Sequence, residues 1–466
     1  MSGSIRFDMA DSSKRIAPGP PGHFLLGNLR EFREDVLGLV VKSAAKYGDI
    51  VRCRLGPHIV HLLNHPDHAE YVLQRHAGNY DKQTRSSETI RSISGESLLT
   101  CNGEFWKRQR RMDQPAFHHC QIAGFAGKMT AAADRMLDRW LGQPSPGAAI
   151  DISSEMARLT YSIVGQTLFS FDTEEDADVI ERAMRVMLPH VFKRLGRIVQ
   201  VPDWIPTPVN WRFRRALNEV DRVVYQIIAR HREAEEKGNP ENDLLAMLMR
   251  ARDPESGAAL GDTQLRNETI TFLLAGHETT ANALTWTFHL ISQHPEVERL
   301  LVEEIRSVLG DRTPTLEDIP KLAYARRVIQ ESMRLYPPIW IIERRAIADD
   351  DIGGFHIPAG SAVVISPYSM HRHPAFWKRP EEFDPARFEE RSPTAYIPFG
   401  AGPRFCIGNE FAMLEAMLIT VMVMRKFHLR MVPGHPVEPM PDITLRSKHG
   451  MMMTLHPRQA KPDVPS

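Results

Sequence analysis

The stretch of sequence that most restricts the possible folds is residues 262–294, DTQLRNETITFLLAGHETTANALTWTFHLISQH. Its apolar residues recur at spacings of three and four, which predicts one α-helix from about Asp262 to His294. Asp262 or Thr263 is the expected N-cap, and Pro295 follows the end of the helix. At ~1.5 Å per residue this helix approaches ~50 Å, which is enough to cross an entire domain.

The rest of the chain predicts a mainly α fold with a small β-sheet region. A second helix follows Cys406, and its side chains from Phe411 to Met424 are apolar on almost every side, which indicates burial. Strand patterns are few. They lie at 50–55 and 59–63 around a turn, and at 341–348, 355–357 and 362–365, where Gly353-Gly354 and Pro358-Ala359-Gly360 indicate similar hairpins.

One large domain is the simplest organisation of the 466 residues. No linker, repeat or low-complexity tract divides the chain, so we expect a single domain at 17–457. The polar ends, residues 1–16 and 458–466, are expected to be flexible.

The overall charge excludes some classes of partner. Lys plus Arg and Asp plus Glu both number 58, so no net field attracts nucleic acid or anionic lipid. Neither a signal peptide nor a run of about 18 apolar residues is present, which predicts a soluble, cytoplasmic protein without a membrane anchor. The four cysteines are too scattered for a disulfide framework. His118, His119 and Cys120 adjoin, but neighbours in sequence rarely bind one metal ion.

The chemistry of the chain is indicated most strongly by residues 399–408, FGAGPRFCIG, directly before the apolar helix. The glycines allow the backbone to come close, and a helix start offers unpaired N–H groups and a positive dipole end to the sulfur of Cys406. Arg404 adds a cation two residues away. Such surroundings suit a thiolate that binds a metal. For a cysteine without these neighbouring residues, the favoured interpretation would be a buried free thiol that packs as a small hydrophobic side chain.

The pattern F-x-x-G-x-R-x-C-x-G resembles the haem-binding signature of the cytochrome P-450 superfamily, the haem-thiolate monooxygenases. Further matches are AGHETT at 275–280, Glu331 with Arg334, and FDPARF at 383–388, so the resemblance covers about Pro18 to Leu455. It implies a triangular helical prism that encloses haem b (iron protoporphyrin IX). It also makes Cys406 the proximal ligand of the iron, in a protein of the soluble bacterial type.

AGHETT places Gly276, Thr279 and Thr280 at the centre of the long helix, where each lowers helix propensity. Two interpretations are open from the residues alone: a functional distortion, or a bend made by the threonines bonding back to carbonyls one turn earlier. The resemblance implies the first. Thr279 then corresponds to the threonine that hydrogen-bonds dioxygen at the haem, and Glu278 to the acid that relays protons to it.

The resemblance also assigns residues that would hold the cofactor. Trp106 and Arg110 match a W-x-x-x-R helix, Arg404 lies beside the ligand, and Phe399 begins the signature. Arg344 matches the arginine that reaches a haem propionate, and Arg345 is the second choice. Glu331 and Arg334 by themselves suggest an exposed salt bridge. The resemblance instead implies a buried network with Arg387.

A lipophilic substrate is expected to bind in a pocket lined mostly by apolar residues. The expected segments are 85–99, 187–201, Phe272 with Ala275 and Thr279, 339–342, and HGMMM near Met451. Fatty acids, terpenoids, steroids and polyketides all remain open as the substrate.

The resemblance implies insertion of one oxygen atom from dioxygen, by hydroxylation or epoxidation. Electrons would come from a ferredoxin or flavodoxin with its NAD(P)H-dependent reductase, docking to a monomer on basic residues: Arg108, Arg111, Arg404, Arg425 and Lys426. The alternatives are a peroxygenase or isomerase on the same haem, or a non-catalytic haem protein that binds a ligand.

Overall fold

The structure is a computed structural model that describes residues 15–142, 147–170, 174–195, 202, 204–239, 241–390 and 394–458. Most of the two predicted flexible ends, 1–16 and 458–466, lies outside these residues, as does the part of the predicted pocket at 196–201. The single-domain organisation at 17–457 stays a prediction.

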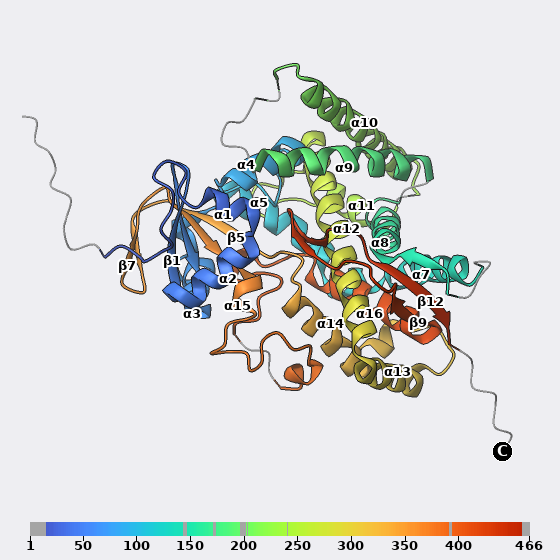
Figure 1. Ribbon diagram of the computed structural model, residues 1–466. Helices are drawn as coiled ribbons and strands as arrows, with labels where there is room; N and C mark the ends of the chain where they lie inside the picture. Colours follow the sequence, from blue (N-terminus) through green and yellow to red (C-terminus); the bar gives the residue numbers. More distant parts are fainter. Residues whose placement is uncertain are drawn as a thin grey trace, which may run out of the picture.

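The predicted long helix is α12 (Asp262–Gln293), which runs through the middle of the molecule (Figure 1). Its bounds match the prediction to within a residue, but the predicted N-cap is wrong. Gly261 caps the helix without a side-chain bond, because Asp262 pairs instead with Arg232 of the neighbouring α10 (Pro208–Glu236). Pro295 begins the next helix, α13 (Pro295–Leu309), after a short break.

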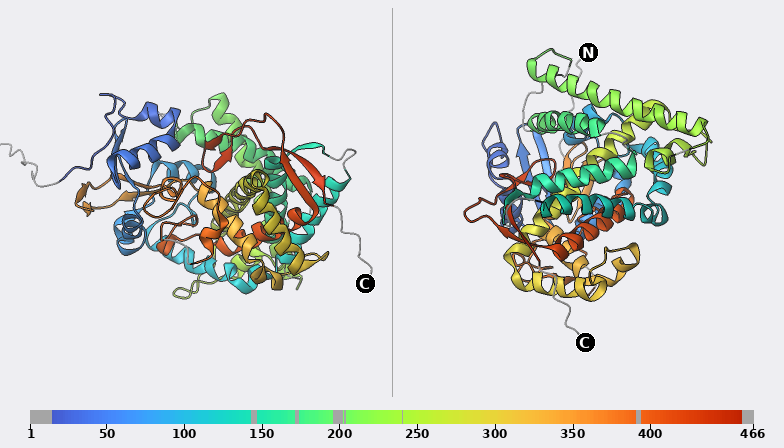
Figure 2. Two further views of the ribbon diagram at one scale, coloured as in Figure 1. Left: turned by 60° about the horizontal axis from the view of Figure 1, so that its bottom comes forward. Right: turned by 90° about the vertical axis from the view of Figure 1, so that its right-hand side faces the viewer.

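The helices surround α12 on several sides, with α9 and α10 across one end and α13 at the other (Figures 1 and 2). The remaining helices are α1 (Leu29–Glu34), α2 (Val36–Tyr47), α3 (Pro66–Glu70), α4 (Arg85–Ser94), α5 (Gly103–Asp113), α6 (His119–Ala123), α7 (Ala126–Leu141), α8 (Ile152–Leu168), α9 (Glu174–Leu195), α11 (Leu244–Arg250), α14 (Ala323–Leu335), α15 (Pro367–Met370) and α16 (Asn409–Lys426). Within the described residues, no helix combines the length and the apolar character that crossing a bilayer requires.

The second predicted helix is α16, and its burial is confirmed. Phe411 and every residue from Leu414 to Met424 are buried, because α16 lies between α7, α12, α13 and α14. The main apolar cluster joins α16 to α12 and α8 through residues such as Leu418, Phe288 and Ile163. The well-buried helices therefore include α16, which follows the Cys406 loop, and α12, which carries AGHETT.

The larger sheet has the strand order β1-β2-β8-β5-β3. Its strands are β1 (Ile50–Leu55), β2 (His58–Leu63), β8 (Ala362–Ile365), β5 (Ile342–Ala346) and β3 (Tyr80–Asp81). The first predicted hairpin is confirmed, since Ile50 pairs with Leu63 and Leu55 with His58.

The predicted hairpin at Gly353-Gly354 is present, but the strand before the turn is β6 (Asp350–Ile352) and not 341–348; it pairs with β7 (Phe355–Ile357). The third predicted hairpin, across Pro358–Gly360, is wrong. β8 pairs in parallel with β2 and antiparallel with β5, which buries Val363 and Ile365 in the apolar cluster beneath the sheet.

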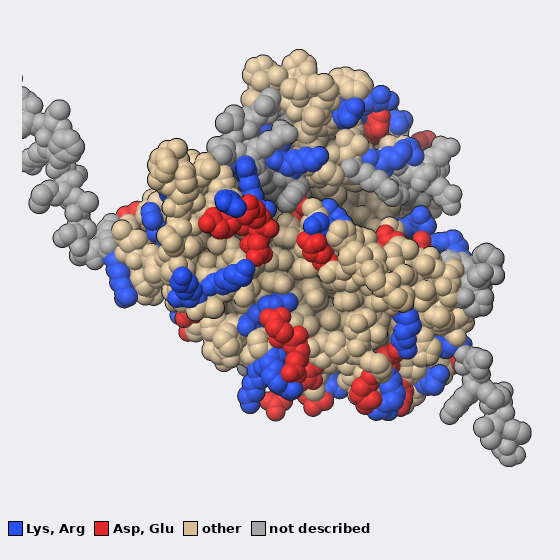
Figure 3. All heavy atoms as spheres, viewed as in Figure 1, with Lys and Arg blue, Asp and Glu red and all other residues tan. Residues whose placement is uncertain are grey.

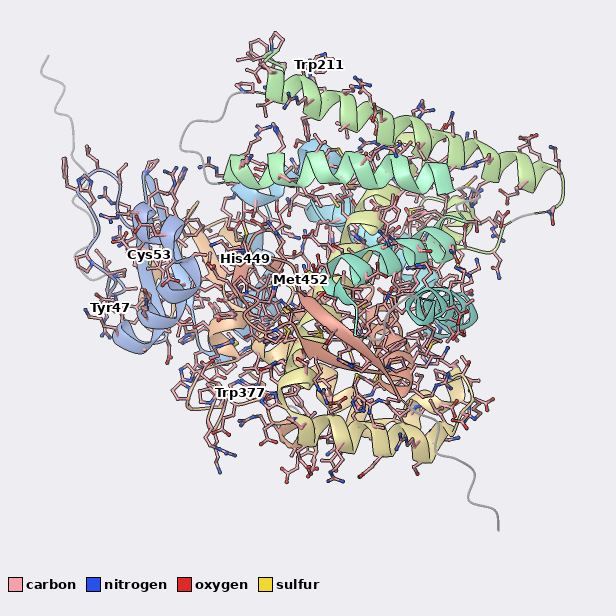
Figure 4. The ribbon with its side chains drawn as sticks, turned by 45° about the vertical axis from the view of Figure 1, so that its right-hand side comes forward. Tyr47, Cys53, Trp211, Trp377, His449 and Met452 are labelled. Carbon is pink, nitrogen blue, oxygen red and sulfur yellow. The ribbon has the colours of Figure 1, made fainter. Side chains whose placement is uncertain are left out.

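Two smaller sheets lie close to α12 and α16 and were not predicted. One has the order β4-β12-β9, formed by β4 (Ala149–Asp151), β12 (Met452–Pro457) and β9 (Phe427–Met431). The other is a hairpin of β10 (Pro439–Pro441) and β11 (Leu445–Ser447). Figure 4 labels Met452 at the start of β12.

Glu331, Arg334 and Arg387 form the buried network that the resemblance implied. Arg334 and Glu331 make a bidentate pair at 2.7 and 2.8 Å, and both side chains are 0% exposed. Arg387 Nε donates to Glu331 Oε1 at 3.2 Å. Arg334 also donates to the carbonyl oxygens of His371, Pro380 and Glu382, so it fixes the chain that leads toward Cys406.

Candidate active site

The loop that carries Cys406 depends on two glycines with left-handed backbone. Gly400 and Gly402 have φ of +74° and +70°, and a Cβ at Gly402 would lie 1.8 Å from the carbonyl oxygen of Leu73. The loop closes when Cys406 N donates to Phe399 O at 3.0 Å. A side chain at position 402 would therefore displace this loop, because both the backbone angle and the available space require glycine.

The Cys406 thiol faces the large internal cavity of the protein. Burial raises its pKa, while the backbone N–H of Gly408 and the guanidinium of Arg110 partly oppose this shift. The sequence suggested that Arg404 is the cation beside the sulfur. In the structure, the cation that lowers the pKa of Cys406 is Arg110. Gly408 directly precedes α16, so the expected contribution of N–H groups at the helix start is present.

The other three cysteines lie elsewhere. Cys53 is in β1, away from α16 (Figure 4), and burial raises its pKa to about 11. Cys101 is buried, with a pKa raised to about 12. Cys120 is exposed, and His118 Nδ1 lies 3.3 Å from its sulfur. In the part of the chain that the structure describes, no group of three metal-ligating side chains includes it.

A group of basic side chains lines the cavity beside the cysteine loop. The Arg404 guanidinium lies 4.4 Å from the ring centre of Trp106, and it donates to Cys101 O at 2.9 Å. Arg110, one turn after Trp106 on α5, donates to Phe405 O at 3.0 Å. Arg344 is 7% exposed, and burial, then Arg404, lower its pKa to about 10. The structure thus brings together Trp106, Arg110, Arg344, Phe399, Arg404 and Cys406.

Arg344 and Arg345 are neighbours on β5, and both border the cavity. Arg345 forms an ion pair with Asp81 at 2.7 Å, whereas the Arg344 side chain is buried. The choice of Arg344 stays a prediction.

Lys82 belongs to the same group, although no motif in the sequence singles it out. Its ammonium donates to Leu99 O at 2.8 Å, and burial, Arg344 and Arg404 hold its pKa well below the usual range. Among the described residues, no salt bridge joins Lys82, Arg344 or Arg404 to a carboxylate. Because YDKQT has the composition of an ordinary polar turn, only the tertiary fold identifies this lysine.

The AGHETT segment is α-helical throughout, so the distortion predicted there does not interrupt the helix. Gly276 packs closely against α8, since a Cβ there would lie 3.1 Å from the Val164 side chain and one of the two would have to shift slightly. Thr279 Oγ1 donates to Ala275 O at 2.7 Å, which is the back-bonding that the sequence left open as an alternative. Thr279 and Glu278 nevertheless line the cavity.

Glu278 is the acid on the cavity wall. Burial raises its pKa, and a hydrogen bond from the Thr444 hydroxyl to Oε1, at 2.8 Å, opposes that shift. An acid with a raised pKa next to a hydroxyl on the cavity surface is suited to donating protons there.

The cavity has a volume of about 1850 Å³ and is lined mainly by apolar side chains. Phe117 and Phe272 meet at a ring-centre distance of 5.0 Å on its wall. Most of the predicted segments contribute, including parts of 85–99, Leu188 and Val191 of α9, and 339–342. Met451 does not line the cavity, because it is buried and its backbone N–H donates to Asp151 of β4. The turn of the β10–β11 hairpin lines the cavity instead.

The predicted basic docking surface is partly neutralised. Arg108 and Arg111 pair with Asp253, and Lys426 lies 3.5 Å from Asp134. Arg404 stacks over the Trp106 ring and lines the cavity, so the prediction that it belongs to the docking surface is wrong. On the face that Figure 3 draws, acidic and basic side chains are interspersed.

Comparisons with known proteins agree with this site. The sequence profile of the family described as "Cytochrome P450" matches residues 17–459. Cyclooctat-9-en-7-ol 5-monooxygenase of Streptomyces melanosporofaciens is 37% identical over 403 residues, covering 84% of this chain and 85% of the relative. Cyclooctatin synthase of the same organism is 34% identical, covering 92% and 93%.

Pentalenene oxygenase of Streptomyces avermitilis is 34% identical over 424 residues, covering 90% of this chain and 92% of the relative. The profile match spans residues 17–459, a range that contains the Cys406 loop, AGHETT and the Glu331–Arg334 pair, and the matches to these relatives cover 84 to 92% of the chain. The chain therefore belongs to the cytochrome P450 family.

Proposed function

We propose that this cytochrome P450 monooxygenase oxidises a cyclic terpenoid at a haem b that Cys406 binds. The observation that carries the proposal is the placement of one accessible thiol, in an apolar cavity, together with Glu278 and Thr279 of α12. The overall reaction takes up dioxygen, two electrons and two protons, and releases the hydroxylated substrate and water.

The residues on the cavity wall fit haem b. Lys82, Arg344 and Arg404 are cations without a carboxylate partner among the described residues, which matches a cofactor with two propionates. Arg110 and Trp106 complete this side of the site. Cys406 would supply the sulfur that binds the haem iron, and Phe399 would pack beside the cofactor.

Haem, when bound, supplies the redox centre at which dioxygen is reduced and its O–O bond is split. The protein supplies the protons. Glu278 would take up a proton and pass it to the hydroxyl of Thr279, which must turn from Ala275 O toward the cavity to donate it. The apolar walls keep other water away, so protons arrive through this pair.

Lys82 gives a prediction about cofactor retention. Lys82→Met is expected to raise the rate of haem loss about tenfold, because one charge-assisted hydrogen bond of about 1.5 kcal/mol or more disappears. Transfer of haem to excess apomyoglobin measures this rate without turnover. Lys107→Met, on the exposed side of α5, is the matched control. Equal haem loss from the two variants would remove Lys82 from the site.

The terpenoid class is supported by two observations. The relatives named above are a cyclooctat-9-en-7-ol 5-monooxygenase, a cyclooctatin synthase and a pentalenene oxygenase. The wall of the cavity that Cys406 faces also carries bulky apolar side chains, among them Phe117, Phe272 and Ile339, which suit a compact hydrocarbon ring system.

The substrate proposal is tested by ligand-induced shifts of the Soret band. Cyclic sesquiterpenes and diterpene alcohols are expected to shift this band with a Kd of about 1 μM, and linear fatty acids of equal carbon number are expected to bind much more weakly. Mass spectrometry should then detect a monohydroxylated product with NAD(P)H, a ferredoxin or flavodoxin, and its reductase. Preference for the fatty acids would contradict the terpenoid class. Equal turnover with hydrogen peroxide alone would favour a peroxygenase.

A further inference from the structure

The turn of the β10–β11 hairpin forms part of the cavity wall and is firmly anchored. Residues 439–444 all line the cavity. The indole of Trp340 donates to Asp442 O at 2.9 Å, and that of Trp286, on α12, donates to Leu445 O at 3.0 Å. Leu445 N also donates to Pro338 O at 2.9 Å. This turn therefore has a fixed position relative to the centre of α12.

Thr444, at the end of this turn, links two residues of α12. Its hydroxyl donates to Glu278 Oε1 at 2.8 Å and accepts from Asn282 Nδ2 at 3.0 Å. Thr444 and Asn282 are only 3% and 7% exposed. Because the Asn282 N–H occupies one lone pair of the hydroxyl oxygen, the hydroxyl proton is directed toward Glu278.

The spacing along α12 explains why this link is specific. Asn282 follows Glu278 by four residues, so the two side chains lie on one face of the helix. Thr444 approaches that face from outside the helix and joins them. Thr279 is the next residue after Glu278, so the direction of the Glu278 carboxyl decides whether a proton can reach the Thr279 hydroxyl.

We propose that Thr444, oriented by Asn282, is a positioning residue that holds the Glu278 carboxyl on the cavity wall for proton delivery. The proposal rests on the proposed function and extends it to two residues outside the AGHETT segment. Without the hydroxyl, Glu278 would lose its only hydrogen-bond donor among the described residues and could adopt other rotamers.

The electrostatic surroundings support this role. Burial favours the neutral acid, whereas the Thr444 hydroxyl stabilises the carboxylate that remains after a proton leaves. Of the charged groups that act on Glu278, Asp442 raises its pKa and Arg446 lowers it. These two pair with each other at 2.5 Å in the same hairpin, so their effects on Glu278 partly cancel. The neutral hydroxyl is therefore the main group that keeps Glu278 able to release a proton.

The test compares Thr444→Val, which keeps the shape but removes the hydroxyl, with Thr444→Ser, which restores it, in the haem-loaded enzyme. Infrared spectroscopy follows the C=O band of protonated Glu278, assigned by its loss in Glu278→Gln. In Thr444→Val the titration of this band is expected to move to higher pH by about one unit. Thr444→Ser should titrate like the natural protein, and melting curves confirm that each variant is folded.

The second measurement is the ratio of product formed to NAD(P)H consumed. Thr444→Val is expected to lower this ratio several-fold and to enlarge the solvent isotope effect, whereas Thr444→Ser recovers both. An unchanged titration in Thr444→Val, or an unchanged product ratio despite a shifted titration, would overturn the proposal. Because the infrared titration needs no substrate, a shift there with no product from any terpenoid would support the positioning role while the proposed substrate class fails.

Discussion

Cys406→Ala is expected to abolish the Soret band that reduced, thiolate-ligated cytochromes P450 show under carbon monoxide, and to abolish product formation. No other thiol can replace this sulfur. Cys53 lies in the distant sheet, Cys101 is buried and its carbonyl oxygen accepts from Arg404, and Cys120 is on the exposed surface. Difference spectra of the reduced protein, recorded with equal amounts of bound haem, measure the effect directly.

The matched control for this variant is Cys120→Ala. Cys120 makes a contact with His118 on the surface, so its removal should leave the carbon monoxide spectrum and turnover as they are in the natural protein. The assignment of Cys406 would be wrong if the alanine variant retained the thiolate spectrum, or if both variants lost it to the same extent.

Arg334→Ala is expected to cost about 3–5 kcal/mol of the free energy of unfolding. The substitution takes the bidentate partner from the carboxylate of Glu331, which is 0% exposed, and leaves Arg387 at 3.2 Å as its remaining charged partner; breaking a buried ion pair in this way is expensive. It also removes the donor to three carbonyl oxygens on the chain toward Cys406. Urea unfolding followed by circular dichroism, at equal haem content, measures this loss.

A surface arginine with a similar pattern of partners provides the control. Arg299 pairs with Glu296 and Glu303, but more than half of its side chain is exposed to solvent. Arg299→Ala should therefore change stability little, because solvent screens such pairs. If the two variants unfolded at the same urea concentration, the buried network would not have the structural role that its geometry indicates.

The elements that the sequence predicted well are those whose signal is local. α12 and α16 have long apolar patterns, and the β1–β2 hairpin has two short strands around a single turn. The failures are non-local. β8 follows the turn at Pro358–Gly360, but it pairs with β2, some 300 residues earlier in the chain, because that position buries both of its faces. No pattern within one segment encodes such a choice.

The same distinction holds at the candidate site. The Cys406 loop could be predicted because its glycines and arginine are close together in the sequence. The function of Gly276 was misjudged because its neighbour, Val164, comes from another helix. Lys82 and Thr444 could not be found, since a single lysine or threonine acquires its meaning only from the residues that the fold brings beside it.

The turn of the β10–β11 hairpin, which ends at Thr444, also matters for protein engineering. Ile443 faces the space where a substrate would bind, and the neighbouring residue contacts the acid on α12. Mutations chosen to admit a bulkier molecule would thus disturb the use of reducing equivalents as well. Selectivity and efficiency are not independent variables at this edge of the cavity, and directed evolution there should score wasted reductant alongside yield.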